Sequence, residues 1–246
     1  MTPGFFGPAG EQLLGVHHPA RGSSKSHGVV LCNPAPQETA RTHWAFRKLA
    51  EALSKAGFDV LRFDYRGTGD SNGELEHTSP AQWVEDVRRA VAELKGISGV
   101  RKVSAVGFRL GAMLLAQAAS QGVALENVVL WEPVVNAANW IERLRNVERQ
   151  LNRSLSRPPK EQREHVLGFV VPEALLQQWE ALELTNVPAW PQRTAVICAQ
   201  RDAHLERLHR HLKSAAWHDV PEAGGDAKTG ALLGNAALER IVGVLS

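Results

Sequence analysis

The strongest constraint on the fold is a repeated alternation of short apolar runs with amphipathic segments along the chain. Strands are expected where β-branched and other apolar residues cluster, at residues 28–32, 58–63, 103–106, 128–131, 195–199 and 215–220. Helices are expected where apolar residues recur at helical spacing, at residues 41–55, 80–94 and 110–120 and after the last two strands. This alternation predicts an α/β fold with a mostly parallel central sheet and helices on both faces. Residues 13–18 are expected as a strand at the edge of that sheet.

One stretch, residues 136–191, departs from the alternation. Its pattern is helical with breaks at Pro158, Pro159 and Pro172, and no strand is expected in it. We therefore expect a helical cap at residues 136–191, inserted over the carboxyl ends of the strands. The core would then consist of residues 1–135 and 192–246. Arginines are frequent in the first half of the cap, which fits either a solvated helix face or a surface that docks a protein partner or an anionic headgroup.

The composition limits which partners and which cellular compartment are expected for the protein. The net charge is +2 with 22% charged residues, so a nucleic-acid partner is not expected. Cys32 and Cys198 both fall in apolar runs, which predicts buried free thiols in a reducing, cytoplasmic protein. The first ten residues lack the pattern of a signal peptide. No apolar run approaches the roughly 18 residues that a membrane span needs.

Three motifs each consist of a predicted strand and the residues that directly follow it. Residues 61–73 read LRFDYRGTGDSNG, a strand followed by a glycine-rich turn. Residues 103–111 read VSAVGFRLG, a strand, a sharp turn and the start of a helix, with Gly107 and Gly111 leaving room where the turn presses on its neighbours. Residues 195–202 read AVICAQRD and end on an acidic side chain. Because the carboxyl ends of parallel strands meet at one edge of the sheet, a shared site is expected there.

In this order the three motifs resemble those of the α/β-hydrolase superfamily, and they are most similar to serine-aminopeptidase-like and exosortase-associated hydrolase-like proteins. The resemblance spans nearly the whole chain outside the expected cap. It implies an α/β-hydrolase fold in which residues 107–111 correspond to the nucleophile elbow G-x-S-x-G. It also implies a triad acid at Asp202 and a triad histidine in the loop at residues 222–230.

The chain departs from the family pattern at two of these three positions. Arg109 stands where the resemblance places the nucleophilic serine, and a guanidinium stays protonated and cannot act as a nucleophile. The loop at residues 222–230 reads EAGGDAKTG and holds no histidine, while His218 is expected inside the preceding strand. Only Asp202 matches a triad position. No residue is therefore assigned a catalytic role, because both the nucleophile and its base are missing.

Arg109 could instead help to bind an anion. It is expected at the N-terminus of a helix, where unpaired amide groups carry partial positive charge. The Leu110 N–H, a donor from Ala35 or Gln37, and the side chain of Glu132 would complete the ligand-binding residues. A carboxylate, phosphate or sulfate would suit such a pocket.

A competing interpretation makes Arg109 a plug. In that case its guanidinium would pair with Asp202 or Glu132, both expected at carboxyl ends of strands, and would fill a dead active site. Glu132 itself either faces the pocket or supports the turn made by Pro133.

The remaining candidates point to structure rather than to chemistry. The histidines lack the spacing of metal ligands, so neither a metal nor another cofactor is expected; they are His17, His18, His204, His209 and His211. Cys32 ends a strand near the pocket but has no evident base, which favours a buried thiol. The tryptophans of the expected cap should pack it onto the core; they are Trp140, Trp179 and Trp190.

Three functions are consistent with these features. The first is a non-catalytic α/β-hydrolase-like protein that binds an anionic small molecule or acyl ligand at Arg109, or a protein partner through the cap. The second is an atypical ester or thioester hydrolase or acyltransferase that uses Asp202 and Arg109. The third is a scaffolding subunit whose pocket is closed.

Overall fold

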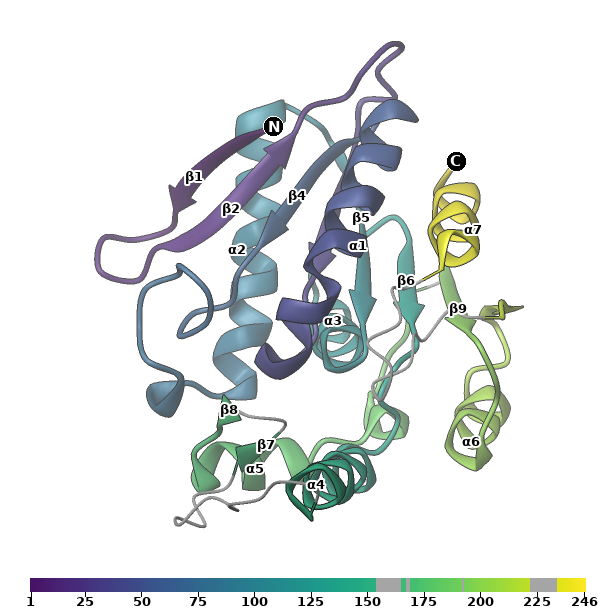
Figure 1. The fold of residues 1–246 in the computed structure, drawn as a ribbon. Helices are drawn as coiled ribbons and strands as arrows, with labels where there is room; N and C mark the ends of the chain where they lie inside the picture. Colours follow the sequence, from purple (N-terminus) through teal and green to yellow (C-terminus); the bar gives the residue numbers. More distant parts are fainter. Residues whose placement is uncertain (154–164, 167–168, 192, 222–233) are drawn as a thin grey trace.

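The computed structural model describes the chain except for residues 154–164, 167–168, 192 and 222–233. Within the described residues, eight strands form one sheet in the order β1-β2-β4-β3-β5-β6-β9-β10. Their bounds are β1 (Thr2–Phe6), β2 (Leu13–His18), β3 (His27–Cys32), β4 (Asp59–Phe63), β5 (Lys102–Phe108), β6 (Val128–Trp131), β9 (Thr194–Cys198) and β10 (Ala216–Asp219). Six of these strands run parallel to one another; they are β4, β3, β5, β6, β9 and β10 in sheet order. β2 pairs antiparallel with β4 (Figure 1).

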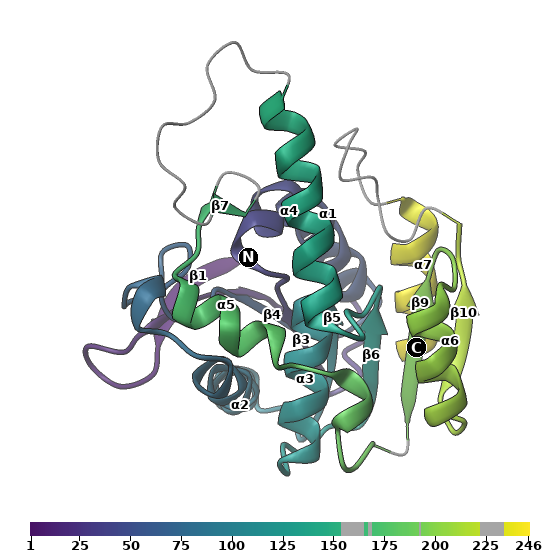
Figure 2. The ribbon, with the colours of Figure 1, turned by 90° about the horizontal axis from the view of Figure 1, so that it is seen from below.

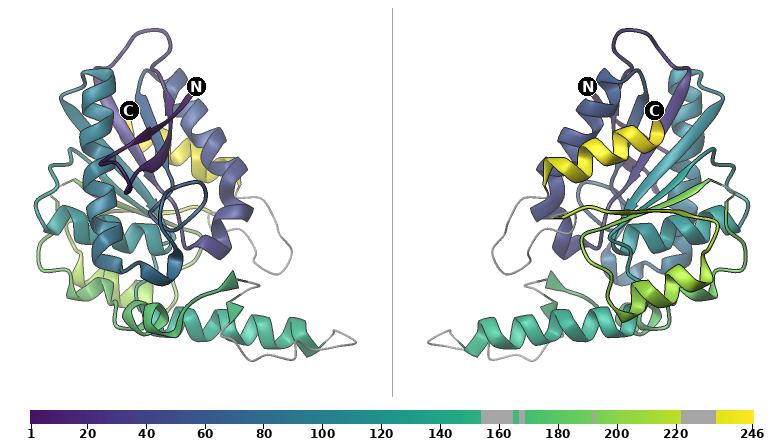
Figure 3. Two further views of the ribbon diagram at one scale, coloured as in Figure 1. Left: turned by 90° about the vertical axis from the view of Figure 1, so that its left-hand side faces the viewer. Right: turned by 90° about the vertical axis from the view of Figure 1, so that its right-hand side faces the viewer.

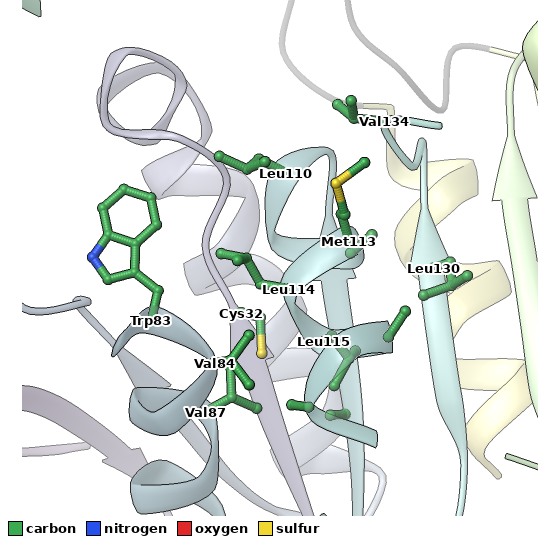
Figure 4. Close-up of a cluster of buried hydrophobic side chains, with 14 of the residues drawn as sticks. Cys32, Trp83, Val84, Val87, Leu110, Met113, Leu114, Leu115, Leu130 and Val134 are labelled. Carbon is green, nitrogen blue, oxygen red and sulfur yellow. The ribbon is translucent and has the colours of Figure 1, made fainter. Parts of the chain in front are cut away.

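Helices cover both faces of this sheet. Their bounds are α1 (Pro36–Lys55), α2 (Pro80–Ser98), α3 (Leu110–Ser120), α6 (Ala203–His211) and α7 (Asn235–Leu245). α1 and α7 pack together on one face, whereas α2 and α3 cover the other (Figure 3). On the α3 face, Leu114 lies beside Cys32 at the end of β3, whereas Met113 lies on the side of Leu130 and Val134 (Figure 4). The predicted α/β-hydrolase class, a mostly parallel sheet with helices on both faces, is confirmed.

Local chemistry explains why α2 begins and ends where it does. The Ser79 side chain accepts a hydrogen bond of 3.3 Å from the Gln82 N–H, and Pro80 occupies the first turn. At the other end Gly99 adopts φ 70°, the left-handed conformation that terminates helices. One face of α2 buries apolar side chains against the sheet, as its spacing predicts.

Two boundaries differ from the prediction. The expected edge strand, residues 13–18, is not at the edge, because β1 pairs antiparallel with it and takes that place. β1 contains Pro3 and Gly4, which weaken any strand pattern in the sequence. The first long helix begins at Pro36, not at residue 41, and the Ala35 carbonyl accepts bonds from the Glu38 and Thr39 N–H groups. Proline at a first helical position explains the earlier start.

The segment between β6 and β9 lies beyond the carboxyl ends of the strands (Figures 1 and 2). It contains α4 (Ala137–Arg153), β7 (His165–Val166), β8 (Phe169–Val170), α5 (Glu173–Glu180) and a short 3-10 helix, η2 (Leu184–Asn186). A similar turn, η1 (Leu75–His77), precedes α2. The expectation of no strand here is wrong, because β7 and β8 form a two-residue antiparallel ribbon that is too short to show an alternating pattern.

Aromatic side chains join this segment to the core. Trp179 of α5 is fully buried, and its ring centroid lies 5.5 Å from that of Trp83 on α2. Trp140 of α4 is 2% exposed and lies 6.3 Å from Trp179 by ring centroids. The Trp179–Trp83 contact agrees with the role expected for the tryptophans, and the Trp140–Trp179 contact joins α4 to α5 within the segment. Pro158 and Pro159 lie outside the described residues.

Among the described helices, none is both long enough and apolar enough to cross a bilayer.

Candidate functional site

Arg109 lies in a tight turn between β5 and α3, at the carboxyl edge of the sheet. Its backbone has φ 52° and ψ −116°, a conformation that residues with a side chain rarely adopt. The Arg109 N–H donates to the Trp131 carbonyl at 3.0 Å, and the Arg109 carbonyl accepts from the Ala112 N–H at 3.1 Å. The turn is thus held by the neighbouring strand and by the first turn of α3.

The flanking glycines are required by close backbone approach. A Cβ atom on Gly111 would lie 2.2 Å from the carbonyl oxygen of Asn33. A Cβ atom on Gly107 would lie 2.5 Å from the carbonyl oxygen of Gly111. Neither position has room for any side chain, so the glycine spacing in the sequence reports a real steric constraint.

The Arg109 side chain pairs with Glu38 of α1. Its Nε lies 3.2 Å from Glu38 Oε1, and the two side chains are 25% and 14% exposed. Burial raises the pKa of the Glu38 carboxyl, although Arg109 and Arg41 pull that pKa the other way. The sequence interpretation named Asp202 and Glu132 as partners and did not consider Glu38. The missed signal was Pro36, because a helix starting there places Glu38 in its first turn.

Glu132 follows β6 and is the neighbour of Arg109 across the strand ends. It also has a positive φ, 45°, and its Oε1 accepts a short hydrogen bond from the Ala199 N–H. Burial raises the pKa of the Glu132 carboxyl, while that hydrogen bond and Arg109 act to lower it. Arg109 and Glu132 are therefore two spatial neighbours with strained backbone conformations. Such a conformation costs about 1–3 kcal/mol for each residue, and strained residues of this kind cluster at functional sites.

Asp202 is committed to the end of a helix. Its Oδ1 accepts from the N–H groups of His204 and Leu205 at 3.0 and 2.9 Å, so it caps α6. Its Oδ2 lies 3.5 Å from Arg143 Nη1 of α4. The carboxylate is therefore placed as a helix cap with a surface ion pair, a poor arrangement for a general base.

Arg109, Glu132, Asp202 and Arg143 line one cavity of about 240 Å³. Two cationic and two acidic side chains thus meet between the strand ends and α4. His204 also lines the cavity, although the sequence interpretation considered it only as a metal ligand and gave it no place at this site.

Two buried polar atoms, one in the cavity lining and one on the partner of Arg109, lack hydrogen-bond partners among the described residues. Trp140 Nε1 and Glu38 Oε2 are buried and make no hydrogen bond there. Trp140 is part of the cavity lining. Since buried polar groups in proteins are nearly always hydrogen-bonded, such atoms indicate a place where a bound molecule could supply the missing partner.

The other predicted ligand-binding residues, Leu110, Ala35 and Gln37, are buried in the protein. Leu110 is fully buried at the start of α3, and Ala35 is fully buried just before α1. Gln37 is 2% exposed, and neither its side-chain nitrogen nor its oxygen has a partner among the described residues. It lies inside α1 and not in the expected loop. The described lining of the 240 Å³ cavity does not include these three residues.

The two cysteines are not placed to act as reactive thiolates. Both thiols are free and buried, and burial raises the pKa of Cys32 and of Cys198 to about 12. No group of three or more metal-binding side chains occurs among the described residues. His218 lies in β10 as expected. The loop at residues 222–230, where the family resemblance would place a histidine, lies outside the described residues.

One prediction concerns Glu38 directly. The raised pKa means that the folded state holds the Glu38 proton more tightly than the unfolded state does. We expect the free energy of unfolding of the wild type to fall relative to that of Glu38→Gln as the pH rises from below 4.5 through the raised pKa. Urea titrations at a series of pH values would measure this difference. Parallel curves, or a wild type that gains stability with pH, would show that Arg109 outweighs burial.

Comparisons with known proteins identify the family and the fold of the chain. A family model described as serine aminopeptidase, S33 matches residues 39–163. In sequence, a stretch of 82 residues is 33% identical to an uncharacterised 31.7 kDa protein from the traX-finO intergenic region of Escherichia coli. That stretch covers 32% of this chain and 29% of the relative, so under a third of the relative's length is matched.

Solved structures share the fold across almost the whole chain. Est1E from Butyrivibrio proteoclasticus with bound ferulic acid has a TM-score of 0.68 at 14% identity, covering 98% of both chains. The enol-lactonase from Burkholderia xenovorans LB400 has a TM-score of 0.65 at 18% identity, covering 98% of this chain and 99% of the other. The bottromycin epimerase BotH, in complex with bottromycin A2, has a TM-score of 0.62 at 21% identity, covering 98% of both chains. At these identities the likeness establishes the fold alone.

Proposed function

Because this chain belongs to the serine aminopeptidase S33 family of α/β-hydrolases, and because arginine occupies its β5–α3 turn, we propose that it is a non-hydrolytic member that binds an anionic small molecule or acyl ligand at Arg109. The observation that carries the proposal is the side chain at that turn. In the family's motif this position bears the nucleophilic serine. Arg109 brings a permanent cation to it.

The described lining of the cavity offers no hydroxyl or thiol in place of the serine. Its described lining contains no serine, threonine or cysteine. His204 is within the lining, but a base without an ionisable hydroxyl or thiol to activate does not restore acyl transfer. Asp202, the acid of the alternative ester or thioester hydrolase or acyltransferase, is engaged in capping α6. This engagement favours binding over water activation.

The cationic groups suit a carboxylate or phosphate. Arg109 brings a planar guanidinium with five N–H donors to the strand ends, the geometry that suits a carboxylate or phosphate. Arg143 adds a second guanidinium from α4 and is 62% exposed. The indole N–H of Trp140 is a further donor in the same lining. Charge-assisted bonds of this kind are about twice as strong as neutral ones.

We also propose that residues 136–191 form a cap over this site, with the core made of residues 1–135 and 192–246. Supporting this division, α4 supplies Trp140 and Arg143 to the cavity, while the strand ends supply Arg109 and Glu132.

Two measurements test the proposed function. A fluorophosphonate probe and a panel of p-nitrophenyl esters and thioesters should give neither labelling nor turnover above background. A thermal-shift series with carboxylates, phosphate esters and acyl-CoA should identify ligands that raise the melting temperature of the wild type. Arg109→Ala should abolish that rise, because it removes the charge-assisted bonds.

The matched control is Arg193→Ala, which removes an exposed arginine paired with Glu126 and leaves the cavity intact. It should keep the full ligand-induced shift. Labelling by the probe would contradict the non-hydrolytic assignment, and a shift that survives in Arg109→Ala would contradict the placement of the ligand.

A further inference from the structure

A second, larger cavity lies on the α1 side of the sheet edge. Its volume is about 480 Å³, and its described lining shares no residue with that of the Arg109 cavity. It is bounded by α1, by the end of β4 with the glycine-rich turn that follows, and by β8. The family motif at residues 107–111 takes no part in it.

Two aromatic side chains at this cavity are unusually exposed. Trp44 of α1 is 57% exposed and Phe169 of β8 is 39% exposed, although both line the cavity. They come from elements far apart in the sequence. Phe46 and Phe63, also in the lining, are buried. Exposed aromatic groups around an apolar floor are typical of sites that bind the flat face of another ring.

A cation in the same lining, Arg62, forms no salt bridge among the described residues. Arg62 of β4 is partly buried, and its Nε donates to His18 Nε2 at 3.2 Å. Burial lowers the pKa of His18 to about 4, so this acceptor is a neutral imidazole. The Asp64 and Glu51 carboxylates act on Arg62 electrostatically from beyond ion-pair distance, so an anionic ligand group could still form a charge-assisted hydrogen bond with its guanidinium.

The nearby acidic side chains do not take that role. Asp64 already accepts hydrogen bonds from Asn33 Nδ2 at 3.2 Å and from the Asp70 N–H at 3.5 Å, which hold the turn after β4. Burial raises the pKa of the Asp64 carboxyl. His43 lines the cavity near Asp64 and can donate a further hydrogen bond.

We propose that this second cavity binds a flat aromatic molecule that carries a carboxylate, with its ring against Trp44 and Phe169 and its carboxylate at Arg62. The site is separate from the one at Arg109 and does not depend on the function proposed there.

Calorimetric titration with 2-naphthoate and with its neutral analogue 2-naphthamide tests the proposal. Trp44→Ala should weaken the binding of both, because it removes the ring contact. Arg62→Gln should weaken naphthoate binding by about 10-fold or more, as expected for loss of a hydrogen bond to a charged group, and should leave naphthamide binding unchanged. Trp44 is mostly exposed, so its variant should fold and keeps the test informative if Arg62→Gln does not.

Two control variants test whether the compounds bind in this cavity and not elsewhere. Phe5→Ala removes another exposed aromatic side chain, on β1, that does not line the cavity, and should bind both compounds as the wild type does. Arg109→Ala should also bind them normally. Absence of naphthoate binding at millimolar concentration, wild-type affinity in Trp44→Ala, or a loss confined to Arg109→Ala would each overturn the proposal.

Discussion

Replacing Gly111 with alanine should destabilise the protein by about 3 kcal/mol or more, at the upper end of what overpacking costs. The added Cβ would lie 2.2 Å from the Asn33 carbonyl oxygen and 2.6 Å from that of Cys32. Both obstacles are backbone atoms at the end of β3, a strand held on both sides by β4 and β5. β3 cannot shift away from the added Cβ without breaking its hydrogen bonds to β4 or β5, so the clash cannot be relieved at low energetic cost.

Guanidinium chloride unfolding of Gly111→Ala and Gly243→Ala would measure the effect. Gly243 lies in α7 with nothing within 4 Å of its would-be Cβ, so alanine there should stabilise the protein by about 0.5–1 kcal/mol. Similar free energies for the two variants would mean that the β5–α3 turn can open. The placement of the Arg109 guanidinium would then not be fixed by the backbone.

The constraint at Gly111 was visible in the sequence because it is local. The glycine spacing at residues 107–111 and the apolar spacing of residues 110–120 lie within one turn and one helix, and α3 has the predicted bounds. The strand at residues 128–131 also matches, because a short apolar run in a parallel sheet is buried on both faces. Patterns of this kind need no knowledge of distant partners.

The ion-pair partner of Arg109 could not be predicted from local sequence patterns in the same way. Glu38 and Arg109 are 71 residues apart in the sequence, and which carboxylate meets the guanidinium depends on how α1 enters from β3. His204 reaches the cavity only because Asp202 starts α6 at the strand end. The positive φ of Glu132 carries no sequence signal, since glutamate is not a residue that favours it. The fold was therefore predictable, whereas the contents of the site required coordinates.

The glycine-rich turn after β4 depends on a buried ion pair that the sequence motif did not reveal. Asp86 of α2 is fully buried and accepts from Arg66 Nη2 at 2.7 Å, from Arg66 Nε at 3.0 Å and from the Arg66 N–H at 3.0 Å. The Arg66 carbonyl accepts in turn from Trp83 Nε1 at 3.0 Å. One carboxylate thus fixes both the side chain and the backbone of the turn to α2.

Asp86→Ala should therefore cost about 3–5 kcal/mol, because it leaves the Arg66 guanidinium, 14% exposed, with only the exposed Glu11 carboxylate, 3.9 Å away, as a counter-charge. Glu85→Ala is the matched control on the same helix. Glu85 pairs with Arg88 at the surface and should contribute less than about 1 kcal/mol. Denaturant titration of both variants measures the contrast. In the Asp86→Ala background, Arg66→Met should recover part of the loss, because it removes the stranded charge. Equal losses for Asp86→Ala and Glu85→Ala, or no recovery by Arg66→Met, would show that the turn is held by packing and not by this ion pair.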